Sequence, residues 1–184
     1  MKRVQFVLLL AFAIPVHAQV SQTIIKAGAG FTHDFPGLNG YTFSGEIAQP
    51  FGSHFEAGFG IKKVNLSGYP RSKTVNEYTK ASTIDFNAYF LPVQSESHIL
   101  RIGIGYSFSF YKIRRSYPLI ENNGSEKTTV WSVQEKKGRI SGAGISGEYE
   151  YIIPESAFSI GIRASLFKAY DRVSYIGPFV GVRI

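Results

Sequence analysis

The fold is decided by the segment from His98 to Lys112, which reads HILRIGIGYSFSFYK. Alternate positions hold Leu, Ile, Tyr and Phe, and the positions between them hold Arg, Gly and Ser. A period of two residues indicates a β-strand. The apolar face is about ten residues long, which is the length that a tilted strand needs to cross a bilayer. The Gly and Ser face suits a crowded polar interior, so the segment predicts one strand of a membrane β-barrel.

Seven further segments alternate in the same way. They cover residues 23–32, 41–51, 54–64, 82–91, 139–153, 157–168 and 174–184. Their connections alternate between short turns at 52–53, 95–97 and 154–156 and mostly longer loops at 34–40, 66–81 and 112–138, with only 171–172 short. Short periplasmic turns and longer outer loops are typical of outer-membrane barrels. We therefore predict an all-β fold, an eight-stranded antiparallel up-and-down transmembrane β-barrel with both termini on the periplasmic side.

The first 18 residues predict a secretory signal peptide. Lys2 and Arg3 precede the apolar run 6–14, and Val16-His17-Ala18 resembles a cleavage site. Residues 19–184 are then the barrel domain. No later apolar run approaches the length of a transmembrane helix. The absence of cysteine excludes disulfides and thiolate metal sites, while 19 Gly, 15 Phe and 11 Tyr fit a small barrel with aromatic belts.

The last predicted strand reads YIGPFVGVRI, from Tyr175 to Ile184. With this strand, the alternating segments and the unequal loops, the chain resembles the small eight-stranded outer-membrane barrels of the OmpA, OmpX and opacity-protein type over residues 19–184. The resemblance implies an outer-membrane location and insertion by the outer-membrane machinery through the C-terminal strand. The chain departs from it by ending on Ile184 rather than Phe. Pro178 removes a hydrogen-bond donor, which predicts a bulge or a weak seam there.

Charged residues on the polar faces balance one another. Five basic and five acidic side chains point inward in the predicted register: Lys26, Lys62, Arg101, Arg163 and Arg183, with Glu46, Glu56, Asp85, Glu148 and Glu150. An eight-stranded barrel has room only for side chains, and unpaired charges there are costly to desolvate. We therefore predict an ion-pair network that fills the lumen, with a narrow charged conduction path as the alternative.

Because the lumen is neutral, the net positive charge of the chain must lie elsewhere. Five basic residues near the outer ends of the predicted strands occupy positions that the alternation assigns to the lipid-facing side: Lys63, Lys80, Lys112, Arg139 and Lys168. This collar is expected at the level of lipopolysaccharide phosphates, which charge-assisted hydrogen bonds would hold. The alternative is that these are ordinary rim residues, whose stems cover apolar surface while their charges reach water.

The segment 112–139 predicts a hairpin that continues above the membrane. Asn123-Gly124 is a strong type I′ turn signal, and strand-forming residues flank it. A ribbon edge can pair with a strand of a partner protein. Arg114, Arg115, Tyr117 and Trp131 are residue types found in binding hot spots, so we assign them to a surface partner. Pro118 predicts a partly protected edge, and a passive loop is the alternative.

An enzymatic site is not predicted. Cleavage of an outer-leaflet lipid would need a nucleophile, a histidine base and a carboxylate at the outer rim. His54 and His98 fall at periplasmic ends, and His33, beside Asp34, lacks a serine two residues away. No phosphate loop, H-E-x-x-H or metal-ligand cluster occurs. We expect no catalytic residue, metal or cofactor, and no nucleic-acid binding, because the basic residues follow the membrane edge.

A soluble exported barrel of lipocalin type, binding an apolar ligand, is the remaining alternative. It would place the Leu, Ile and Phe faces inside and the Gly and Ser faces in water. We disfavour it because glycines on solvated faces weaken strands without any gain in packing.

Overall fold

The computed structural model describes residues 22–72, 74–123 and 126–184, without the side chains of 122, 123, 126 and 127. Eight strands make up the chain: β1 (Ile24–Asp34), β2 (Asn39–Pro50), β3 (Phe55–Gly68), β4 (Glu77–Gln94), β5 (His98–Asn123), β6 (Glu126–Ile152), β7 (Phe158–Lys168) and β8 (Arg172–Arg183). Within the described ranges, no helix is long and apolar enough to cross a membrane. The predicted signal peptide lies outside these ranges.

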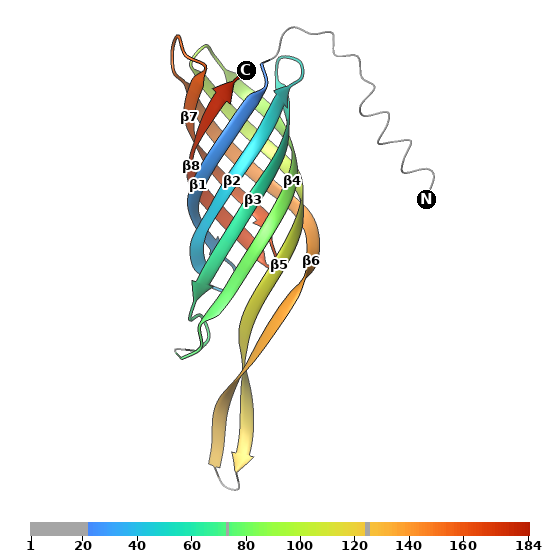
Figure 1. The fold of residues 1–184 in the computed structure, drawn as a ribbon, viewed down its shortest axis with the longest axis vertical. Helices are drawn as coiled ribbons and strands as arrows, with labels where there is room; N and C mark the ends of the chain where they lie inside the picture. Colours follow the sequence, from blue (N-terminus) through green and yellow to red (C-terminus); the bar gives the residue numbers. More distant parts are fainter. Residues whose placement is uncertain (1–21, 73, 124–125) are drawn as a thin grey trace, which may run out of the picture.

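Each strand pairs antiparallel with the next, and β1 pairs with β8, so the sheet closes into a barrel. This confirms the predicted eight-stranded up-and-down fold. Figure 1 shows the C-terminus and the start of β1 at one end of the barrel, and the extended β5–β6 hairpin at the other. We call these the terminal end and the loop end.

The two faces of the strands are oriented as predicted. On β5, Ile104 is 68 % exposed on the outside, whereas Arg101 is fully buried inside. The same alternation runs along β1 to β4, β7 and β8. The lipocalin-type alternative is therefore wrong, because the charged face is the interior and the Ile and Phe face is the outer surface.

The strands extend further toward the loop end than predicted. β3 continues to Gly68 and β4 begins at Glu77, so their loop is much shorter than 66–81. The predicted ribbon is confirmed, since β5 and β6 stay paired up to Asn123 and Glu126. The turn itself, which includes Gly124, lies outside the described residues. These extensions arise because cross-strand pairing continues where the sequence alternation becomes irregular.

The seam between β1 and β8 is interrupted beside Pro178. Pairing runs from Ile24 to Gly28 and resumes at Phe31 in the same register, so no bulge is present. The weak seam predicted at Pro178 is thus confirmed, without the bulge that was the other expectation. The irregularity of register lies instead between Phe90 and Val93. The backbones approach closely at the break, because a Cβ added to Gly30 would lie 2.5 Å from the Cα of Gly177.

Apolar residues close the barrel interior toward the loop end. The buried cluster there consists of Leu38, Val64, Leu66, Ala81, Tyr111, Ile113, Phe167, Ala169, Val173 and Tyr175. A smaller cluster of Tyr89, Leu91 and Ile99 lies nearer the terminal end. Burial of each Val, Leu, Ile or Phe side chain in these clusters stabilises the barrel by about 1.5–3 kcal/mol. The larger apolar cluster therefore lies between the charged middle of the lumen and the loop end.

Candidate functional site

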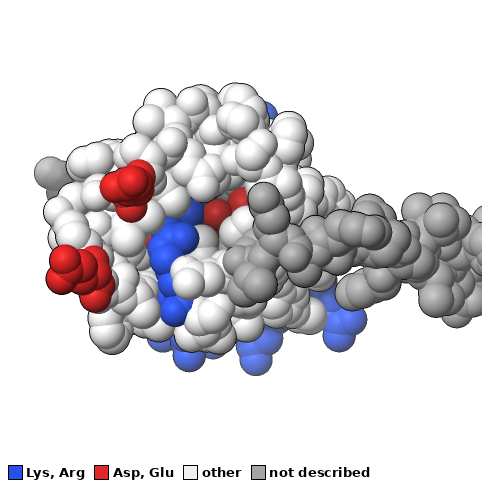
Figure 2. Space-filling model, turned by 90° about the horizontal axis from the view of Figure 1, so that it is seen from above, with Lys and Arg blue, Asp and Glu red and all other residues white. Residues whose placement is uncertain are grey.

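The middle of the lumen holds one network of four acidic and four basic side chains. Its members are Glu46, Glu56, Glu148 and Glu150, with Lys26, Arg101, Arg163 and Arg183. The strands bring them together because each side chain occupies an inward position of its strand. The formal charges cancel, as an interior without bulk water requires. Figure 2, seen from the terminal end, shows basic and acidic atoms together inside the mouth.

Two side chains connect this network. The Lys26 ammonium lies 2.9 Å from Glu148, 3.1 Å from Glu56 and 3.3 Å from Glu46. The Arg101 guanidinium lies 3.0 Å from Glu56 and also contacts Glu150. Tyr89 donates a hydrogen bond to Glu46 at 2.8 Å. The network thus joins β1, β2, β3, β5 and β6 across the barrel, which fixes their separation.

The remaining two predicted lumen charges form a separate pair nearer the loop end. The Lys62 ammonium lies 3.0 Å from the Asp85 carboxylate and 4.4 Å from the ring centroid of Phe167. The internal space beside this pair, lined also by Tyr89 and Arg163, measures only about 10 Å³. A volume of roughly 10–15 Å³ holds one water molecule. The space beside this pair therefore has room for about one water molecule, which is evidence against conduction at this level of the lumen.

Arg115 lies inside the barrel at the loop end, not on an exposed loop surface. It is 2 % exposed, and its guanidinium lies 2.9 Å from Asp171 and 3.3 Å from Asp34. Its assignment to a surface partner is therefore corrected. The physical reason is that the inward series Arg101 to Ser109 continues along the longer β5 through Tyr111 to Arg115. Had the alternation of inward and outward residues been continued beyond Lys112, it would have predicted that Arg115 points inward.

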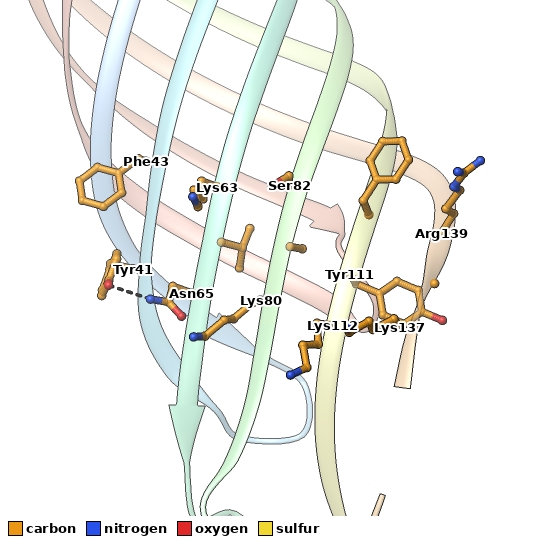
Figure 3. A pocket seen from close by; sticks show the side chains of 14 residues that line it. Tyr41, Phe43, Lys63, Asn65, Lys80, Ser82, Tyr111, Lys112, Lys137 and Arg139 are labelled. Atoms are coloured by element: carbon orange, nitrogen blue, oxygen red, sulfur yellow. Dashed lines mark hydrogen bonds between the residues drawn. The ribbon is translucent and has the colours of Figure 1, made fainter. Parts of the chain in front are cut away.

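Basic side chains gather on one side of the outer surface near the loop end. Five of them line a concavity of about 830 Å³: Lys63, Lys80, Lys112, Lys137 and Arg139. We call these five residues the basic patch. Figure 3 shows them on β3 to β6, with Tyr41 and Phe43 of β2 at the border. Four belong to the predicted collar, and Lys137 was missed, although its parity matches that of Arg139.

The basic patch places like charges directly opposite one another. Lys80 pairs in register with Lys112, and Lys112 pairs with Lys137. Like charges at opposed positions destabilise a sheet unless a counter-charge is present. The counter-charge shown is Glu135, whose carboxylate lies 3.2 Å from Lys112. This hydrogen bond, helped by that from Tyr78, holds the pKa of Glu135 below its usual range.

Aromatic rings lie beside the basic patch. The Arg139 guanidinium lies 5.4 Å from the ring centroid of Phe110, and Lys112 lies 5.5 Å from that of Tyr78. Tyr41 accepts a hydrogen bond from Asn65 at 2.7 Å (Figure 3). Rings and cations at one level suit the border between hydrocarbon and headgroups. The arrangement can therefore hold an anionic headgroup above acyl chains.

Lys168 of the predicted collar lies apart from the basic patch, so the five collar residues do not form one group. It ends β7 and lies beside Gly142 of β6, where a Cβ on the glycine would be 3.0 Å from the Lys168 Cβ. The alternation of the sequence assigned Lys168 to the lipid-facing side of its strand, but it could not show where around the ring of strands this residue lies.

The other residues assigned to a surface partner lie on the ribbon. Tyr117 is exposed and lies 5.7 Å from the Arg71 guanidinium. Trp131 is half-buried and pairs in register with Pro118, and Arg114 is half-buried beside Tyr78. These three remain at the surface, whereas Arg115 does not.

His33 has a different partner from the one that catalysis would need. Its Nδ1 lies 2.8 Å from the side-chain oxygen of Asn39. Ser174, on the neighbouring β8, donates its hydroxyl hydrogen bond to the backbone carbonyl of His33 at 3.1 Å. In this arrangement the imidazole does not activate the serine.

Comparison with known proteins found similarity in structure only. No family model matches the chain, and no curated protein matches its sequence. The chain is similar to the attachment invasion locus protein Ail of Yersinia pestis, with 13 % identity, a TM-score of 0.52, and coverage of 89 % of this chain and 99 % of Ail. Neisserial surface protein A gives 12 % identity, a TM-score of 0.55, and coverage of 89 % and 96 %. The N-terminal barrel domain of Pseudomonas aeruginosa OprF gives 11 % identity, a TM-score of 0.52, and coverage of 89 % and 98 %. The chain therefore has the fold of the small eight-stranded outer-membrane β-barrels.

Proposed function

We propose that this protein is an integral outer-membrane barrel that binds the phosphates of lipopolysaccharide through its basic patch. The observation that carries the proposal is the row of opposed lysines, Lys80, Lys112 and Lys137, on the lipid-facing surface. An external polyanion would relieve the repulsion between them. Phosphate accepts several charge-assisted hydrogen bonds at once, so it suits such a cluster.

The interior supports a structural role for the barrel rather than transport. The lumen charges are paired, and an apolar cluster that includes Leu66 and Phe167 closes the loop end. Removal of one partner from a buried ion pair is strongly destabilising. The lumen is thus best understood as a rigid filling that holds the strands at a fixed spacing.

Export and membrane insertion belong to the same proposal. Residues 1–18 would direct secretion, and the C-terminal strand β8 would be presented to the outer-membrane insertion machinery. Support comes from the closed ring and the apolar outer surface. With the ribbon outside the cell, the basic patch lies at the outer leaflet.

One of the similar structures contains a polyanionic ligand. Ail of Yersinia pestis has been solved in complex with sucrose octasulfate, a heparin analogue, and that structure matches this chain with 13 % identity and a TM-score of 0.54. Sulfate and phosphate present similar oxygen acceptors to Lys and Arg. By analogy, we extend polyanion binding to the basic patch of this protein.

The test compares binding of purified lipopolysaccharide with and without its phosphates to the detergent-solubilised barrel. The double variant Lys63→Gln, Lys80→Gln should weaken binding about tenfold or more, since each basic residue contributes roughly 1 kcal/mol at an anionic surface. The control is Lys136→Gln, which removes an exposed charge of β6 that does not line the concavity. Equal binding of the dephosphorylated form, or an equal loss in the control, would contradict the proposal.

The ribbon supports a second candidate function, contact with a surface protein. Leu119, Ile120 and Val133 are exposed on it beyond the barrel. Exposed apolar groups on an unprotected strand edge favour β-strand addition by a partner. We expect a variant in which Ser116 and Val133 are joined by a two-residue turn to fold normally and to lose attachment to host cells. Unchanged attachment would exclude the ribbon.

A further inference from the structure

The pairing of β6 with β7 stops halfway along β6. It runs from Ile152, opposite Ser159, to Ile145, opposite Leu166. On its other side, β6 stays paired with β5 along almost its whole length. Among the described residues, positions 126–144 of β6 therefore have no strand partner on the side away from β5. Figure 1 shows β6 continuing past the end of β7.

The cause is that the end of β7 turns into the barrel. The carbonyl of Lys168 accepts a hydrogen bond from Ser109 of β5 at 2.9 Å. The ring of Tyr170 packs on Tyr111, with centroids 4.7 Å apart, and Ala169 is fully buried. The β7–β8 turn is thus held against the inner face of β5, and the stem of Lys168 covers the inner face of β6 at Gly142 without pairing with that strand.

A cleft of about 690 Å³ separates the diverging strands. One wall is residues 142–145 of β6, and the other is residues 166–168 and 170–172 of β7, the turn and β8. The interior behind it, bordered by Gly144 and Phe167, measures only about 10 Å³. The cleft therefore opens sideways to the membrane and ends blindly at the filled lumen.

The chemistry of the cleft changes from apolar to basic along its length. Ile145 and Leu166 are exposed on the lipid-facing surface. Two residues further along β7, the half-buried Lys168 pairs in register with the exposed Arg172 of β8, and the Lys168 stem crosses the gap to Gly142 of β6. Among the described residues that line the cleft, the one acidic side chain is Asp171, which is held by Arg115 at 2.9 Å. The two basic side chains are thus left to an external anion.

The backbone of β6 adds a second requirement. At membrane depth, unpaired N–H and C=O groups cost several kcal/mol each unless a polar group reaches them. The unpaired edge at 142–144 lies directly above the apolar part of the cleft. An occupant must therefore combine an anion, hydrogen-bonding groups close to it, and an apolar chain below.

We infer that the β6–β7 cleft seats one phosphorylated membrane lipid of the outer leaflet. Its phosphate lies between Lys168 and Arg172, its ester or amide groups face the free edge of β6, and an acyl chain runs along Leu166 and Ile145. The lining shares no residue with the concavity of the basic patch, so this site is independent of the proposed function.

The experiment places a fluorescent reporter in the cleft. Trp131 is the only tryptophan in the sequence, so Leu166→Trp in a Trp131→Phe background gives a single emitter. The protein is reconstituted in phosphatidylcholine vesicles that contain a small fraction of phosphatidylglycerol, and either lipid carries bromine on its acyl chains. Each basic residue at an anionic headgroup favours that lipid by roughly fivefold. Two such residues therefore predict about tenfold or more enrichment of phosphatidylglycerol beside the reporter.

Three comparisons separate the outcomes. Adding Lys168→Gln and Arg172→Gln should abolish the enrichment, whereas adding Lys63→Gln and Lys80→Gln should leave it. A reporter at Ile104→Trp, on the outer surface of β5, should show no preference. Equal quenching by both brominated lipids in the Leu166→Trp protein, or enrichment that survives loss of Lys168 and Arg172, would overturn the inference. Unchanged lipopolysaccharide binding in the Lys63→Gln, Lys80→Gln variant would overturn only the proposed function.

Discussion

The substitution Glu148→Gln tests whether the barrel depends on the balance of charges in its lumen, because it replaces one carboxylate by a neutral amide of nearly the same shape. The Glu148 carboxylate is fully buried and lies 2.6 Å from Arg163 and 2.9 Å from Lys26. At an effective dielectric constant near 20, each such attraction amounts to about 4 kcal/mol. Part of this is offset, because the amide avoids the desolvation cost of the carboxylate, which is several kcal/mol. We expect a net loss of about 3–5 kcal/mol in the free energy of unfolding.

The assay is reversible urea unfolding of the barrel in phospholipid vesicles, followed by the fluorescence of Trp131 and by the mobility of unheated samples on gels. Glu155→Gln, at an exposed turn outside the network, is the control and should change the free energy by less than about 0.5 kcal/mol. Adding Lys26→Met to Glu148→Gln restores neutrality and should recover part of the loss. A loss below about 1 kcal/mol for Glu148→Gln would refute the reasoning, because it would mean that water or mobile ions solvate the lumen.

Three further changes test other parts of the structure. Ile104→Arg puts a charge on the lipid-facing surface and should cost roughly 2–4 kcal/mol, so the variant should be missing from the outer-membrane fraction; normal accumulation would show that the register is wrong. Gly30→Ala should slow barrel closure, because its Cβ would collide with the backbone carbonyl oxygen of Ile176 on β8, whereas Gly45→Ala, with its nearest atom at 3.8 Å, should refold at the normal rate; equal refolding rates would contradict the close approach at the seam. Glu135→Gln removes the carboxylate that competes for Lys112, so binding of lipopolysaccharide should strengthen by roughly two- to fivefold; weaker binding would show that Glu135 positions the lysine.

The alternation of residue types was sufficient to predict the number of strands and their inward faces. The prediction succeeds because the side-chain period of a strand is two, so a polar series such as Arg101 to Ser109 assigns every second residue to the lumen. All ten predicted lumen charges lie in ion pairs. Which acid meets which base was not predictable, since it depends on the stagger between strands around the ring.

The errors in the predicted strand end and in the placement of Arg115 occur where the inward-facing residues of β5 change from small and polar to large. Near the loop end the inward residues become Tyr111, Ile113 and Arg115, so the rule that inward means small and polar no longer holds. The barrel strand was therefore predicted to end at Lys112, and Arg115 was assigned to the outside. The position of a residue around the ring was also not predictable from the sequence. The alternation included Lys168 in the collar but could not show that it lies apart from the basic patch, and Lys137, which joins the patch, was missed.

The closed mouth and the open cleft have one structural cause. Turning the end of β7 inward buries Phe167 and Ala169 and brings Asp171 to Arg115, which closes the loop end. The same turn withdraws β7 from β6 and leaves a strand edge without a strand partner over residues 126–144 of β6, within the described ranges. On the ribbon this edge is in water, which satisfies its polar groups. At 142–144 it faces the membrane, and Lys168 and Arg172 lie beside that part of the edge. A barrel that fills its own mouth in this way thereby forms a lateral site whose polar requirements a phosphorylated lipid meets.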